Sequence, residues 1–294
     1  MTINRTFRAV AAVAAATLTL GLGACSSSAD KTAGEKSGPI VIGTTDANLE
    51  EWGVFEEVAK KAGVDIKVQN FSDYNTPNQA LDQGELDANK FQHLKFLAEY
   101  NAGNGTDLVP LAATEIYPLA IYWKDHTDLA GIEGKEIVIP NDSTNQGRAI
   151  NLLVQQGLVK LKEDGLVTPA PADIDTAASK VKVTPVDAAQ TPAGYGEGKP
   201  AVINNSFLER AGIDPLSAVA KDDPNSTEAE PYINVWAVRA EDADNEQLNK
   251  LAELWKDPAV TEAVKKSSGG TAVPVERPRE ELQAILDRLE KAQA

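Results

Sequence analysis

Short apolar runs alternate with segments in which apolar residues recur every three or four positions. Residues 39–45 are typical of a buried strand, and residues 48–62 have helical spacing, with Gly63 as the stop. The pattern repeats with an alternating strand at residues 66–71 and a helix at residues 93–100. This order predicts an α/β fold in which helices cover a parallel or mixed sheet.

Two strand ends place aromatic and polar residues at one edge of the predicted sheet. The strand at residues 66–71 ends just before Tyr74, and a second short strand, residues 86–88, runs into Phe91 and His93. Ligands of open α/β sheets bind outside the carboxyl ends of strands. We therefore expect Tyr74, Phe91 and His93 in neighbouring loops at a binding site.

The rest of the chain continues the mixture of strands and helices. Further strands are predicted at residues 108–116, 119–123, 136–139, 181–183, 201–203 and 232–238. Helices are predicted at residues 144–156, near residue 174, and at residues 246–255, 258–266 and 277–294. Residues 221–231 are interpreted as a surface loop and residues 194–198 as a mobile loop. The last helix is expected to pack on the first domain, with docking of another subunit as the alternative.

Composition limits the partners more than it defines the fold. The 294 residues include 42% apolar and 24% charged side chains, as in ordinary soluble domains. A net charge of −16 argues against nucleic acid as a partner, because phosphate binding needs clustered Lys and Arg. The single cysteine excludes a disulfide within the chain.

The first residues have the pattern of a targeting segment. Arg5 and Arg8 precede an apolar run, residues 10–22, which is too short for a typical membrane span. Leu22-Gly-Ala-Cys25 resembles a lipobox, so we predict a signal peptide at residues 1–24 and lipid on Cys25. A polar tether at residues 25–38 would follow, outside the cytoplasm at the cell membrane. The alternative is an ordinary secretory signal with a chance cysteine.

Enzyme signatures are missing from the sequence. Only His93 and His126 are present, without HExxH, CxxC or G-x-S-x-G patterns. We therefore expect neither catalysis nor a metal or other cofactor.

Several long motifs resemble the methionine-binding lipoproteins of ABC importers, the NlpA lipoprotein family. The motifs are Phe71-Ser-Asp-Tyr74, Pro77-Asn-Gln-Ala-Leu81, Asp87-Ala-Asn-Lys-Phe-Gln-His93, Tyr117-Pro118, Ile139-Pro-Asn-Asp142 with Asn145 and Arg148, and Ala201-Val-Ile-Asn204. The resemblance implies a type II periplasmic-binding-protein fold, with two lobes, two crossover strands and a ligand cleft. Its lobes would be residues 39–121 with 234–294, and residues 122–233.

Asn145 and Arg148 lie three residues apart at the start of a predicted helix and so share a face. Unpaired backbone N–H groups and the helix dipole favour an anion there, and a guanidinium offers bidentate binding of a carboxylate. From the residues alone, a surface Arg paired with a nearby acid is the stronger interpretation. The resemblance reverses this preference, because Arg148 matches the family's carboxylate-binding arginine.

The other candidates also lie on resembling motifs. Asn204 matches a family asparagine that holds the ligand's backbone groups, and Asn234 matches its partner, although either could serve turn geometry instead. Tyr74, Phe91, His93 and Tyr117 would enclose a thioether side chain, because sulfur contacts ring edges favourably. Taken alone, His93 is more typical of a structural histidine.

The sequence therefore predicts a lipid-anchored binding protein that delivers L-methionine to the permease subunits of an ABC transporter. The alternative ligands are D-methionine, a methionine-containing dipeptide or another apolar amino acid. A surface adhesin and an enzyme on the same fold remain as alternatives of other classes.

Overall fold

A computed structural model describes residues 38–293. The expected signal peptide, the lipid site at Cys25 and the tether up to residue 37 lie outside the described residues. Within residues 38–293, none of the helices has both the length and the apolar character needed to cross a membrane.

The first lobe is built on a five-stranded sheet with the strand order β2-β1-β3-β11-β4. Its strands are β1 (Ile40–Thr44), β2 (Ile66–Asn70), β3 (Ala88–His93), β4 (Leu108–Ala113) and β11 (Asn234–Arg239). β1 pairs in parallel with β2 and β3, whereas β11 runs antiparallel between β3 and β4. The sheet is therefore mixed, and β11 brings a late part of the chain into its centre.

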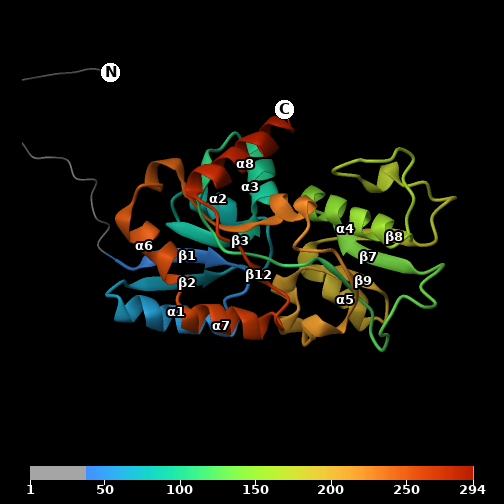
Figure 1. Ribbon diagram of the computed structural model, residues 1–294, viewed down its shortest axis with the longest axis horizontal. Helices are drawn as coiled ribbons and strands as arrows, with labels where there is room; N and C mark the ends of the chain where they lie inside the picture. The colour runs from blue at the N-terminus through green and yellow to red at the C-terminus, as the bar shows by residue number, and fades with distance from the viewer. Residues whose placement is uncertain (1–37, 294) are drawn as a thin grey trace, which may run out of the picture. The chain divides into compact units, whose positions relative to one another are not determined.

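Helices cover both faces of this sheet (Figure 1). One face is covered by α1 (Glu50–Lys61), α6 (Glu246–Leu254) and α7 (Pro258–Ser267). The other is covered by α2 (Pro77–Asp82), α3 (Leu94–Asn104) and α8 (Arg279–Lys291). Leu282 and Leu286 of α8 are buried with Leu97 of α3, which confirms that the last helix packs on the first lobe.

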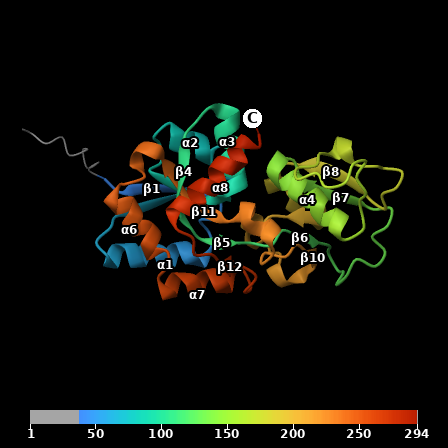
Figure 2. The same ribbon diagram turned by 45° about the horizontal axis from the view of Figure 1, so that its top comes forward.

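The second lobe is built on a separate five-stranded sheet with the order β10-β6-β9-β7-β8. Its strands are β6 (Ala120–Tyr122), β7 (Glu136–Pro140), β8 (Lys182–Val186), β9 (Ala201–Ile203) and β10 (Ala218–Lys221). The sheet is packed between α4 (Ser143–Gln155) and α5 (Thr191–Gly196). Figure 2 shows the two sheets as the centres of separate lobes, joined by the strands near β5 and β6.

Short elements complete the described chain. β5 (Glu115–Ile116) and β12 (Val273–Pro274) form a two-stranded ribbon. Single 3-10 turns occupy Pro171–Asp173, Ala188–Gln190, Asn205–Phe207, Glu209–Ala211, Pro215–Ser217, Thr227–Tyr232 and Ala240–Asp242. The chain enters the second sheet at β6 and returns to the first at β11, as the two-lobed fold requires. The lobe boundaries drawn from the sequence stay a prediction.

Several details of the sequence interpretation are wrong. β3 extends through His93, so Phe91 and His93 lie in a strand and not in a loop after it. No α-helix forms near Ile174, which makes an isolated bridge with Leu161 after a single 3-10 turn. The expected mobile loop at residues 194–198 largely belongs to helix α5, which packs against β7 and β9.

Candidate functional site

A cavity between the two lobes is lined by residues from both sheets. It encloses about 560 Å³ of space free of protein atoms, counting its opening to solvent. The eight binding residues expected from the sequence all line this one cavity: Tyr74, Phe91, His93, Tyr117, Asn145, Arg148, Asn204 and Asn234.

The N-terminus of α4 forms one wall of the cavity. Asp142 is the N-cap residue, and its Oδ1 accepts hydrogen bonds from the backbone N–H of Asn145 at 2.9 Å and from its amide Nδ2 at 2.9 Å. This cap starts the helix so that Asn145 and Arg148 both face inward, and each side chain is buried. The shared face predicted from their spacing is therefore present.

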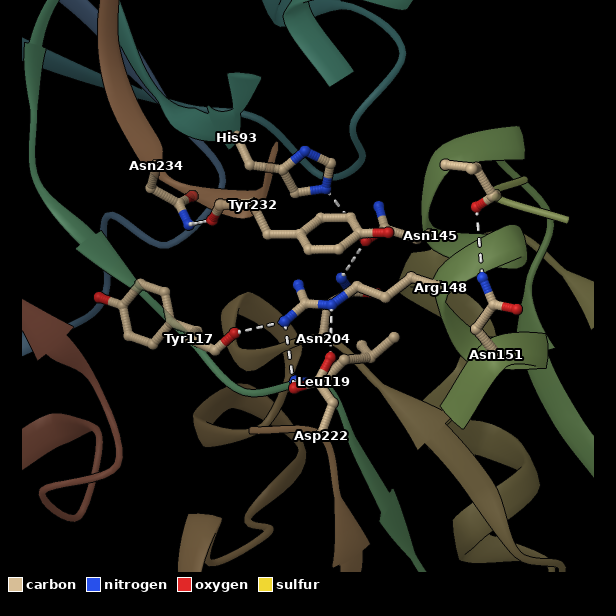
Figure 3. Close-up of polar contacts among 11 residues, drawn as sticks. His93, Tyr117, Leu119, Asn145, Arg148, Asn151, Asn204, Asp222, Tyr232 and Asn234 are labelled. Atoms are coloured by element: carbon tan, nitrogen blue, oxygen red, sulfur yellow. Dashed lines mark hydrogen bonds and ion pairs between the residues drawn. The ribbon is translucent and has the colours of Figure 1, made fainter. Parts of the chain in front are cut away.

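Arg148 is held by two other segments of the chain (Figure 3). Its Nε donates to Asp222 Oδ2 at 2.7 Å, and its Nη2 donates to Asp222 Oδ1 at 3.2 Å and to the Tyr117 carbonyl at 2.9 Å. The Tyr232 ring lies 4.1 Å from the guanidinium carbon. Nη1 makes no hydrogen bond to the described residues.

The interpretation of residues 221–231 as a surface loop is wrong at Asp222. The carboxylate of Asp222 is only 16% exposed, and it also accepts a hydrogen bond from Leu119 N–H at 2.9 Å. Arg148 pairs with an acid, as the residues alone suggested. It also lines the cavity, as the resemblance to the family suggested. The bidentate geometry expected for a ligand carboxylate is used here by Asp222, which binds the Nε–Nη2 edge.

His93, Asn145 and Asn204 form a hydrogen-bonded chain across the cavity. His93 Nδ1 accepts from Phe96 N–H at 3.0 Å, so Nε2 carries the proton and donates to Asn145 Oδ1 at 3.3 Å. Asn204 Nδ2 donates to the same oxygen at 3.0 Å. Burial, assisted by the charge of Arg148, lowers the pKa of His93 to about 3, so the ring stays neutral.

No hydrogen bond joins Asn204 and Asn234, the two asparagines expected to act together. Asn204 Oδ1 is buried and has no hydrogen-bond partner among the described residues. Asn234 lines the cavity from β11, and its Nδ2 makes only a long bond of 3.4 Å to the Tyr232 carbonyl. Asn204 therefore offers a free acceptor, which a ligand N–H would satisfy.

Three aromatic rings form an apolar part of the cavity wall, called here the aromatic group: Tyr74, Phe91 and Phe96. Their ring centroids are 5.8–5.9 Å apart, and Phe207 supports Tyr74 from behind at 4.8 Å. Phe96 was not among the residues predicted from the sequence, and it lies three residues after His93 on the first turn of α3. Tyr117 has no ring contact with the aromatic group, and its ring lies 6.0 Å from Lys90 Nζ.

Charged residues that the sequence analysis did not select also border the cavity. Lys90 Nζ pairs with Glu115 Oε1 at 2.5 Å, and both side chains are at most 5% exposed. Asp46 follows β1 and lines the cavity beside them. The rule that ligands lie beyond strand ends would have identified Asp46, because this residue comes just after the first strand.

The lobes touch on both sides of the cavity. Ser143 of α4 donates to Glu99 of α3, and Asn48 donates to Glu209 on the other side. Together with the bond from His93 to Asn145, these contacts hold the cleft in a closed arrangement. Residues 38–293 contain no group of three or more His, Cys, Asp or Glu side chains placed to hold a metal ion.

Two lobes closed over a cavity that combines charged groups with an apolar wall define a substrate-binding protein of the kind that serves ABC transporters. The chain belongs to the NlpA lipoprotein family, whose model matches residues 40–276. This is a family of substrate-binding proteins and not of enzymes. The family assignment and the two-lobed α/β fold expected from the sequence are confirmed.

Named relatives and solved structures agree with this assignment. The chain is 32% identical to the D-methionine-binding lipoprotein MetQ of Salmonella typhi over 272 residues, which is 91% of this chain and 97% of that protein. The substrate-binding protein of a methionine transporter from Streptococcus pneumoniae superposes with a TM-score of 0.74 at 30% identity, covering 81% and 95% of the two chains. A nutrient-binding protein from Burkholderia cenocepacia bound to methionine gives 0.73 at 37% identity, covering 80% and 99%.

Proposed function

We propose that this protein captures methionine outside the cytoplasm and delivers it to the permease of an ABC importer. A lipid on Cys25 would keep it at the membrane surface. The observation that carries the proposal is the cavity itself, which brings a buried guanidinium and the aromatic group into one closed space. A zwitterion with an apolar tail is the class of ligand that matches these two features.

The polar end of the ligand would bind at the start of α4. Arg148 lines this space, and its Nη1, which has no hydrogen-bond partner among residues 38–293, would donate to the carboxylate. Such charge-assisted hydrogen bonds contribute about 1.5–3 kcal/mol. The free Oδ1 of Asn204 would accept from the ammonium, with Asn234 assisting from β11.

The apolar end would lie against the aromatic group. Burying a methionine side chain contributes about 1.5–3 kcal/mol. Each contact between sulfur and a ring edge adds about 0.3–1.5 kcal/mol. The relatives named for methionine support this ligand over another apolar amino acid, while D-methionine and a methionine-containing dipeptide remain the alternatives to test.

Calorimetry on the full-length protein tests the ligand. The protein is denatured and refolded before titration, because binding proteins of this kind can retain ligand through purification. We expect stoichiometric binding of L-methionine and at least tenfold weaker binding of leucine, whose shorter branched chain lacks sulfur. Tighter binding of D-methionine or of glycyl-methionine would correct the ligand, and failure to bind any of them would contradict the proposal.

The membrane anchor is tested separately. Cys25→Ser removes the only sulfur that can carry the lipid and lies outside the described fold, so binding should stay unchanged. We expect this variant in the soluble fraction and the unchanged protein in the membrane fraction. Membrane retention of Cys25→Ser would contradict a lipid anchor on this residue.

A further inference from the structure

Asp46 is a buried carboxylate at the edge of the ligand cavity that the proposed site does not yet use. It follows β1 in the first lobe, and its side chain belongs to a residue only 5% exposed. Oδ1 accepts hydrogen bonds from Thr44 Oγ1 at 2.5 Å and from Trp52 Nε1 at 2.8 Å. Oδ2 has no hydrogen-bond partner within residues 38–293, although Asp46 lines the cavity.

The strand register places Asp46 near the expected ligand. Gly43 of β1 lies opposite Asn89 of β3 in a parallel pair, so Asp46 and Gln92 are each three residues further along. Asn234 of β11 is in turn opposite His93 of β3. Asp46 therefore lies at the same end of the sheet as the cavity residues of the first lobe, and it lines the cavity that Arg148 lines from the second lobe.

The buried acids around Asp46 outnumber Lys90, the one buried cation beside them in the described chain. Lys90 is committed to Glu115 and lies over the Trp255 ring at 4.5 Å, and no ion pair joins it to Asp46 among the described residues. Burial raises the pKa of neighbouring Glu51 to about 7, so this acid is largely protonated in mildly acidic solution. With Glu51 neutral, the carboxylates of Asp46 and Glu115 share the single ammonium group of Lys90. A buried carboxylate without a counter-charge is costly, which favours binding of a cation in the cavity.

We infer that Asp46 is the counter-ion for the ammonium group of the bound amino acid and selects ligands that carry this charge. The inference deepens the proposed function and rests on it. The carboxylate of the ligand would be held by Arg148 of the second lobe, and its ammonium would lie between Asn204 of the second lobe and Asp46 of the first. A zwitterion would thus pair with Arg148 through its carboxylate and with Asp46 through its ammonium. A ligand without the ammonium would leave Asp46 without a counter-charge.

A pair of ligands tests this directly. Methionine and 2-hydroxy-4-(methylthio)butanoate share the carboxylate and the thioether, and differ in having an ammonium or a hydroxyl. Calorimetry on the refolded full-length protein measures both affinities for the unchanged chain, Asp46→Asn and Asp46→Glu. Asp46→Asn keeps an oxygen acceptor for Thr44 and Trp52 while removing the charge, and thermal unfolding verifies that each variant is folded.

We expect Asp46→Asn to lose about tenfold or more in affinity for methionine and to bind the hydroxy analogue as well as or better than the unchanged protein. Asp46→Glu should retain the preference for methionine because it retains the charge. Equal losses for both ligands, or no loss for either, would overturn the role of Asp46 and leave the proposed function standing. If Asp46→Asn does not fold, Asp46→Glu alone gives the test. The inference is then overturned if Asp46→Glu loses the preference for methionine while it binds the hydroxy analogue normally. An unchanged protein that binds no methionine would overturn both.

Discussion

Replacing Arg148 by alanine removes a guanidinium that serves the fold as well as the expected ligand. The variant loses two hydrogen bonds to Asp222 and one to the Tyr117 carbonyl. Asp222 would remain with the single bond from Leu119 N–H and with a side chain that is 16% exposed. The substitution therefore changes both ligand affinity and the free energy of unfolding.

The two effects have different sizes. Removing one partner of a buried ion pair costs about 3–5 kcal/mol, and the partial exposure of Asp222 reduces this to about 2 kcal/mol. For a chain of this length, such a loss lowers the melting temperature by about 4–8 °C. Loss of a charge-assisted bond to the ligand carboxylate lowers affinity by a further factor of about 10 to 150.

A second substitution separates the effects. Arg148→Ala/Asp222→Ala removes both charges, so no buried carboxylate is left unpaired, and most of the lost stability should return. The affinity should stay as low as in Arg148→Ala, because the ligand still lacks the guanidinium. Arg277→Ala is the matched control, since Arg277 is 48% exposed in a surface ion pair and should affect neither property.

Thermal unfolding without ligand and calorimetry with methionine give the two readouts for each variant. The reasoning is refuted if Arg148→Ala retains both the melting temperature and the affinity of the unchanged protein. It is also refuted if the double variant binds methionine normally, because Arg148 would then have no part in the site.

Three further predictions follow from single contacts or charges. Because the pKa of Glu51 is raised in the fold, its ionisation destabilises the protein as pH rises from about 4.5 to 7. Glu51→Gln should therefore raise the free energy of unfolding at pH 8, measured with urea, by about 1–3 kcal/mol. No gain would contradict the burial of this carboxyl group and its raised pKa. His93 should stay neutral from pH 5 to 8, so its ring resonances should not shift in an NMR titration, and a midpoint near 6.5 would contradict its burial. A Cβ on Gly194 would lie 2.6 Å from Val138 Cγ2, so Gly194→Ala should lower the free energy of unfolding in denaturant by about 1–3 kcal/mol. Gly196→Ala is the control and should have no such effect, because the space around Gly196 is open. Equal effects would contradict the close packing of α5 on Val138.

Much of the first lobe could be predicted because its signals are local. The apolar run of β1, the helical spacing of α1 with Gly63 after it and the amphipathic face of α8 each specify an element over a few residues. The eight cavity residues could also be selected, because seven lie in motifs that resemble the family and Asn234 matches a family asparagine on the return strand. Their roles toward a ligand stay predictions.

The rest depended on contacts that no local pattern contains. Asp222 meets Arg148 across 74 positions of sequence, so its polar, proline-containing surroundings indicated only a surface loop. The glycines around Gly194 suggested mobility, whereas Gly194 is needed where α5 packs closely on Val138. Asp46 could have been predicted, because it follows the first strand and ligands bind beyond strand ends. Phe96 could also have been predicted, because it lies on the helical turn directly after His93.

The most direct test of the central claim is a crystal structure of the refolded protein with selenomethionine as the added ligand. The chain contains one methionine, Met1, inside the segment expected to be removed, so a selenium signal would come from the ligand alone. The account predicts one anomalous peak within the aromatic group, with the ligand carboxylate at Arg148 Nη1. A peak outside the cavity, or a selenium atom placed beside Arg148 with the carboxylate among the rings, would contradict it.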